Sequence, residues 1–154
     1  MEVKNNTPNL DRIEKEMTYL QKHGVIIGIY GKNGDKLVDG VKIIFYAEKL
    51  ITGTAFMPPR DFMGHKLKSK KGITEIARLQ KTLLSKVFKG ELTGQQALMQ
   101  IGIRGVQMVK ESITSNDFAP LSPKTIKMKT RNKNNILRDT DALLDSVAFE
   151  IVNL

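Results

Sequence analysis

The segment that decides the fold is TDALLDSVAFEI, residues 140–151. Thr140 stands where a helix N-cap belongs, so it predicts a short helix over about 141–145. Leu143 of that helix is expected to be buried. From 147 to 151, large apolar side chains alternate with smaller or charged ones, which is typical of a strand. This last strand is expected to close a sheet.

Two longer helices precede that segment. The first is predicted over about 73–89, with apolar side chains on one face and Gly90 as its end. The second begins after Thr93, which can cap it, and runs to about residue 113. Gly102 and Gly105 weaken this helix by about 1 kcal/mol each relative to Ala. We expect another backbone to approach closely at these two glycines.

The first half of the chain predicts a helix, a hairpin and a loop. Apolar residues recur at helical spacing over about 9–22. The β-branched segments 25–30 and 41–46 flank an Asn-Gly turn, which predicts a β-hairpin. Residues 52–72 contain two prolines and few apolar anchors, so we expect an extended, mobile loop.

The segment 120–135 is basic and punctuated by prolines. Ser122 and Pro123 predict a short helical turn over about 125–128, and a polar loop follows at 132–135. The complete order of elements implies a single α+β domain over 1–154. We expect a small antiparallel sheet with helices packed on one face and a long extended loop.

The composition bounds the function. The chain has 154 residues, which suits one domain, and 40% of them are hydrophobic. It contains no cysteine, which excludes disulfides, thiolate zinc sites and cysteine nucleophiles. Residues 1–9 show no signal-peptide pattern, and no apolar run reaches the roughly 20 residues that span a bilayer. We therefore expect no membrane association.

The net charge of +9 is concentrated in two segments. Residues 64–89 carry a local charge of +7, and residues 120–138 carry +6. Such segments can bind nucleic acid or an acidic partner, or they can be solvated surface. The candidate basic contact surface consists of Lys66, Lys68, Lys70, Lys71, Lys124, Lys127, Lys129, Arg131 and Lys133.

Catalytic signals are weak. His23 and His65 are the only histidines, and neither has a metal-ligand spacing. Asp139, Asp141 and Asp145 cluster in the sequence, and a structural role is favoured over a divalent-metal site. We expect no catalytic residue, no cofactor and no metal, and hence no enzyme.

Three stretches together resemble a known family. YAEKLITGT (46–54) followed by MPPRDFM (57–63) resembles a segment of phage tail-completion and head–tail joining proteins. KESI (110–113) ends a helix as in those proteins. FAPLSPKTIKMK (118–129) leading to ILRDTDALLDSV (136–147) is similar to the virion morphogenesis proteins of Mu-like phages. Phe118 replaces a Trp of one subgroup, and Asp141 stands where Gly is usual.

The resemblance implies a structural virion protein that forms a homo-oligomeric ring, often a hexamer. It implies a place in the neck or at the tail end, between the portal or connector and the tail-tube or sheath proteins, after synthesis in a bacterial cytoplasm. Nonspecific contact with DNA in the lumen is compatible with this role. The fold motif would be Pro120, Thr140, Leu143 and Ser146, and the candidate assembly loop would present Pro58, Pro59, Arg60 and Phe62 to a neighbour.

Alternatives stay open at this point. The resemblance does not separate a neck joining protein from a tail terminator, or a phage from a phage-tail-like particle. A basic nucleic-acid-binding accessory protein is the main alternative function. A small nuclease is a further one, but it would need a cluster of acids or histidines that the sequence does not offer.

Overall fold

The structure is organised around the long helix α6 (Gly94–Thr114). The computed structural model describes residues 8–154. As predicted, Thr93 begins α6: its hydroxyl accepts from the Gln96 N–H, and Gln96 accepts from the Thr93 N–H. The other elements are α1 (Pro8–Lys22), β1 (His23–Gly28), α2 (Gly31–Gly34), β2 (Leu37–Val38), β3 (Val41–Lys42), α3 (Ile43–Thr52), α4 (Gly64–Leu67), α5 (Lys70–Lys89), α7 (Pro123–Met128), α8 (Ala142–Ser146) and β4 (Ala148–Asn153).

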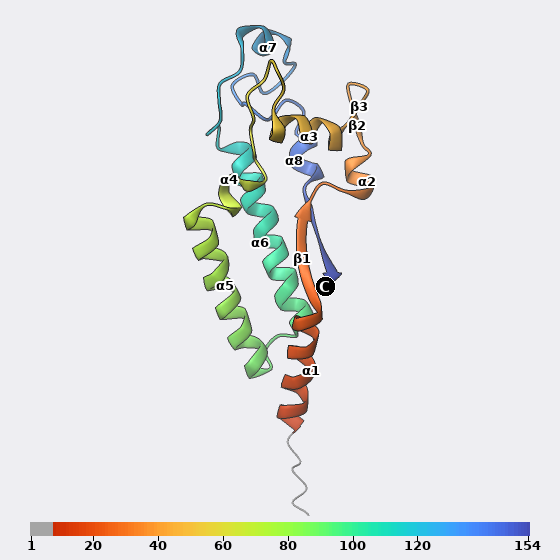
Figure 1. The fold of residues 1–154 in the computed structure, drawn as a ribbon, viewed down its shortest axis with the longest axis vertical. Helices are drawn as coiled ribbons and strands as arrows, with labels where there is room; N and C mark the ends of the chain where they lie inside the picture. The colour runs from red at the N-terminus through yellow and green to blue at the C-terminus, as the bar shows by residue number, and fades with distance from the viewer. Residues whose placement is uncertain (1–7) are drawn as a thin grey trace, which may run out of the picture.

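A two-stranded antiparallel sheet joins segments from the two halves of the chain. β1 pairs with β4, and the register sets Val25 opposite Ile151 and Ile27 opposite Phe149. Figure 1 shows this narrow sheet lying along α6, with α5 on the other side of that helix. The α+β fold with a small antiparallel sheet is therefore confirmed, as are the predicted last strand and both long helices.

The predicted hairpin of 25–30 with 41–46 is wrong. β1 takes β4 as its partner, the Asn-Gly turn lies in the helical turn α2, and most of 41–46 belongs to α3. The only hairpin there joins the two-residue strands β2 and β3. Ile43, Ala47 and Leu50 are buried at helical spacing, so packing against distant segments overrides the strand preference of the β-branched residues.

The two glycines of α6 make room for the sheet. A Cβ at Gly102 would lie 2.2 Å from the Phe149 ring, and one at Gly105 would lie 2.1 Å from Ile27 Cδ1. Side chains from β4 and β1 therefore occupy the space above these residues. The close neighbours are side chains, so the expected close approach of another backbone is wrong.

The apolar interior has two clusters of unequal size. The larger one brings α3, α8 and the second half of α6 together with Phe62, which is fully buried. The smaller one consists of Leu83, Val87 and Ala97, between α5 and the start of α6. α1 supports this second region, because the Arg12 guanidinium donates to the carbonyl oxygens of Val87 and Phe88, each at 2.8 Å.

The predicted loop over 52–72 is shorter in the structure. Irregular backbone extends only from residue 53 to residue 63, and α4 and the start of α5 follow. The Ser69 hydroxyl caps α5 by accepting from the Gly72 N–H at 3.0 Å. A Cβ at Gly72 would lie 1.9 Å from the Lys66 carbonyl oxygen, so α4 and α5 meet in a joint that only glycine permits.

Of the four residues of the predicted fold motif, Leu143 is buried as expected, and Ser146 is buried as well. The Pro120 carbonyl accepts an internal hydrogen bond described below. Thr140 does not cap α8. The cap position belongs to Asp141, which has a left-handed backbone with φ of 62° and holds Arg138 by two hydrogen bonds.

Candidate functional site

Several segments singled out in the sequence gather at one end of the molecule. We call residues 53–63 and 118–141 the apical end. Figure 1 shows α7 and the loop before α4 together at the top, away from α1. The predicted assembly loop thus lies beside the predicted basic segment, although about 60 residues separate them in the sequence.

Arg60 joins the two parts of the apical end. Its side chain is almost completely buried, with 3% of its surface exposed. Its Nε donates to the Ala119 carbonyl at 3.1 Å, and one Nη donates to the Pro120 carbonyl at 3.4 Å. Arg60 is therefore an internal support, and the buried Phe62 lies in the core beneath it. Of the four predicted assembly-loop residues, only Pro58 and Pro59 face solvent.

The most exposed apolar side chain nearby is one that the sequence analysis missed. Phe56, with 99% of its surface exposed, occupies the tip of a tight turn. Thr54 and Met57 close this turn with two backbone hydrogen bonds of 2.8 and 3.2 Å. Gly53 precedes this turn with a left-handed φ of 75°. A Cβ at this position would lie 2.9 Å from the Met57 carbonyl oxygen, so the turn requires glycine here. The signal was present in the sequence: an aromatic residue just before two prolines, with no charge from 52 to 59.

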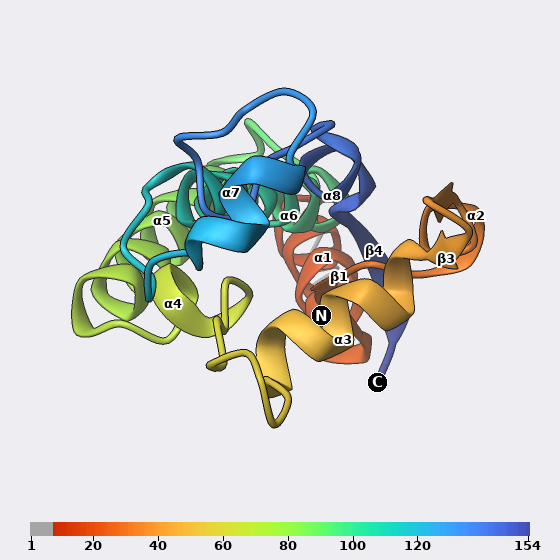
Figure 2. The same cartoon turned by 90° about the horizontal axis from the view of Figure 1, so that it is seen from above.

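A second exposed apolar group lies at the opposite end of α3. Figure 2 shows the 53–63 loop at one end of α3 and the β2–β3 hairpin at the other. We define the hairpin patch as the exposed apolar residues Leu37, Val41, Ile44, Phe45 and Tyr46. Val41 and Tyr46 line a depression that also contains Asp139. Ile44 lines a different depression, with Ile29, Ala47, Glu48, Ile51, Thr52 and Met63. α3 thus carries uncovered apolar surface at both ends.

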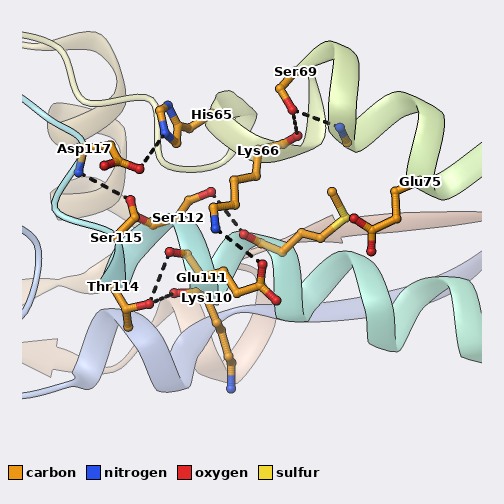
Figure 3. Close-up of polar contacts among 12 residues, drawn as sticks. His65, Lys66, Ser69, Glu75, Lys110, Glu111, Ser112, Thr114, Ser115 and Asp117 are labelled. Atoms are coloured by element: carbon orange, nitrogen blue, oxygen red, sulfur yellow. Dashed lines mark hydrogen bonds and ion pairs between the residues drawn. The ribbon is translucent and has the colours of Figure 1, made fainter.

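Three of the nine predicted basic contact residues have partners within the protein, although the Lys68 side chain stays largely exposed. Lys66 pairs with Glu111 at 3.4 Å, as Figure 3 shows, and Lys68 lies 3.9 Å from Asp61. Lys129 is enclosed by the loop that follows it: its Nζ donates to the carbonyls of Asn132, Asn135 and Arg138. Burial lowers the pKa of Lys129, although nearby Asp139 opposes that effect.

Glu111 belongs to a wider ion-pair network along α6. Arg104 contacts Glu75 of α5 at 2.6 Å and Glu111 at 2.8 Å. These hydrogen bonds lower the pKa of both carboxyl groups and raise the pKa of Arg104. Figure 3 shows Glu75 and Glu111 approaching from different helices, with Ser69 at the start of α5. The network holds α4 and α5 against α6. It also neutralises the charge of Lys66, which belongs to the predicted basic contact surface.

The remaining predicted cations are free. Lys70, Lys71, Lys124, Lys127, Arg131 and Lys133 are exposed, and none forms a salt bridge within residues 8–154. Lys70 and Lys71 lie at the start of α5. The other four lie on α7 and on residues 129–141, which we call the apical loop. The structure therefore divides the predicted basic surface between two places.

The side chains considered for catalysis have structural partners. His23 bonds the Tyr19 carbonyl at 2.8 Å, and His65 lies 3.5 Å from Asp117 and against the Phe118 ring. Asp139 accepts from the Arg131 N–H at 2.8 Å and from Thr130, which lowers its pKa. Within residues 8–154, no group of three or more His, Asp or Glu side chains is arranged to hold a metal ion.

Comparisons with protein-family models, curated proteins and solved structures give no match to this chain. Among the helices of residues 8–154, none combines the length and apolar character needed to cross a bilayer.

Proposed function

We propose that this chain is a structural virion protein that forms a ring at the head–tail junction or tail end of a phage or phage-tail-like particle. The supporting observation is the uncovered apolar surface at both ends of α3: Phe56 at one end and the hairpin patch at the other. The resemblance to tail-completion and head–tail joining proteins supplies the biological setting. The portal or connector and the tail-tube or sheath proteins would be its partners.

The placement of these two surfaces favours a ring over a simple dimer. A twofold dimer uses the same surface on both subunits, whereas a ring joins two different surfaces head to tail. Phe56 and the hairpin patch are different surfaces of one chain. The turn that carries Phe56 bears no charge, so it can enter an apolar site without burying an unpaired ion. We infer that Phe56 of one subunit packs on the hairpin patch of the next.

Light scattering across a concentration series tests this proposal. We expect the wild-type mass to rise to a discrete oligomer, and Phe56→Ser and Phe45→Ser to remain monomeric at the same concentrations. Phe88→Ser is the matched control, since Phe88 is also exposed but lies at the end of α5. Its mass should follow the wild type. A wild-type chain that stays monomeric throughout would contradict self-assembly.

Mixing the two variants distinguishes a head-to-tail contact from a symmetric one. Phe56→Ser keeps an intact hairpin patch, and Phe45→Ser keeps an intact Phe56. One sound contact can therefore form between the two variants, and we expect the mixture to give a dimer but no ring. If the mixture stays monomeric while each variant is folded, the head-to-tail arrangement is wrong.

A further inference from the structure

The solvent face of α5 carries a row of basic side chains. Lys70, Lys71, Arg78, Lys81 and Lys89 are all exposed. With 3.6 residues per turn, these five positions fall within an arc of about 100° on the helix. The buried residues of α5, namely Gly72, Leu83 and Val87, lie on the opposite side. The predicted basic contact surface contains only the first two of these cations.

This row of cations is not neutralised by the rest of the protein. Within residues 8–154, none of the five forms a salt bridge. Glu75 is the only acidic residue of α5, and Arg104 of α6 holds it at 2.6 Å. Lys70, Lys71 and Arg78 line a shallow depression with Thr74 and Glu75. The face therefore combines concentrated positive charge with a hollow that a compact anion can enter.

The geometry suits a regular polyanion. Residues 70 to 89 extend about 28 Å along the helix axis, at 1.5 Å per residue. Duplex DNA carries one negative charge per about 1.7 Å of its axis, so a face of this length lies beside many phosphates. α5 is also the outermost long helix, on the far side of α6 from the sheet (Figure 1).

The composition of the face favours duplex DNA over an acidic protein or a single strand. Protein–protein interfaces are enriched in aromatic residues and depleted in Lys, whereas four of these five cations are Lys. Single-strand binding uses aromatic platforms for stacking. Phe88 is the one aromatic residue of α5, and a single exposed ring at the end of the helix cannot stack successive bases. Lysine contacts to phosphates carry no sequence information.

We propose that this face of α5 binds the phosphate backbone of duplex DNA without sequence preference. The inference goes beyond ring assembly and does not depend on it, since one subunit carries the complete face. Its five cations define the contact, and the free cations of α7 and the apical loop do not take part.

Two triple variants of equal charge test the assignment. One is Arg78→Gln, Lys81→Gln and Lys89→Gln on α5, and the other is Lys124→Gln, Lys127→Gln and Lys133→Gln at the apical end. Each lowers the net charge of +9 by three. Binding to a labelled duplex of about 20 base pairs is followed by fluorescence anisotropy from about 50 to about 200 mM NaCl. Polyglutamate serves as a competitor, and circular dichroism checks folding.

We expect log affinity to fall with log salt at a slope of about −4.5 for five phosphate contacts. The α5 triple should lose about 2.7 from the magnitude of that slope, and the apical triple should keep the wild-type slope. Equal losses in both triples would mean that net charge alone drives binding, and the proposal fails. Competition by polyglutamate as strong as by unlabelled duplex would overturn it in favour of an acidic partner.

Discussion

Gly72 fixes the angle between α4 and α5 by having no side chain. The Lys66 carbonyl fills the space that a Cβ would need, and the Ser69 hydroxyl accepts a hydrogen bond from the Gly72 N–H. Backbone cannot move aside as a flexible side chain can. The absence of a Cβ at Gly72 therefore sets the direction in which α5 continues from α4.

Gly72→Ala should destabilise the protein by at least about 1–3 kcal/mol, the range for overpacked sites. Gly28→Ala is the control, because a Cβ at Gly28 meets only the Tyr30 ring at an ordinary 3.4 Å. Thermal unfolding measures both. If Gly72→Ala melts together with Gly28→Ala, the joint is more tolerant than its geometry indicates.

At the scale of single elements, the sequence predicts well those features that depend on neighbouring residues. Thr93, Ser122 and Gly90 mark helix ends by short-range hydrogen bonds, and these boundaries are correct. The strand predicted over 41–46 is wrong because Phe62, Leu137 and Leu143, which pack against the buried side of α3, come from far along the chain. The partner of Lys66 was hidden for the same reason, because Glu111 lies 45 residues away. Phe56 was missed because a turn gives no periodic signal.

The loop over 129–141 should depend on pH through Asp139. Hydrogen bonds from the Arg131 backbone and from Thr130 hold the pKa of Asp139 below its ordinary value. A carboxyl group with a lowered folded pKa stabilises the protein above its unfolded pKa of about 3.9. That contribution is lost as the pH falls through the lower, folded pKa.

Asp139→Asn should therefore lower the melting temperature most at neutral pH, and the gap to wild type should close below about pH 4. Melting curves from neutral to acidic pH measure this gap. Asp145→Asn is the control, because the Asp145 carboxylate is exposed and accepts no hydrogen bond within residues 8–154. A gap for Asp139→Asn that stays constant with pH would contradict a role for its charge.

At the scale of the whole molecule, stability is expected to be uneven. The larger cluster unites α3, α8 and α6, whereas α5 rests on the three-residue cluster of Leu83, Val87 and Ala97. Regions with few buried apolar contacts open at lower free-energy cost than the core. The helix that carries the basic face is therefore attached by less apolar packing than α3 or α6.

Hydrogen exchange should reveal this difference. We expect amides of α5 to exchange faster than those of α6 around Val109, which is fully buried. Leu83→Ala should speed exchange in α5 while leaving α3 protected, and Ile113→Ala should speed it in both, because Ile113 lies in the larger cluster. Uniform acceleration by Leu83→Ala would mean that the two clusters unfold as one unit.

The pairing of β1 with β4 also has a consequence for biosynthesis. The first residue of β4 follows the last residue of β1 by 120 positions. At about 5–20 residues per second, a ribosome needs roughly 6–24 s to make that stretch. During this interval β1 has no partner strand, so its backbone N–H and C=O groups are unpaired. Such an edge can pair with a strand of another chain. α6 is complete only after residue 114, so for most of this interval a nascent chain of this protein carries β1 without either the helix or the strand that packs against it in the finished fold.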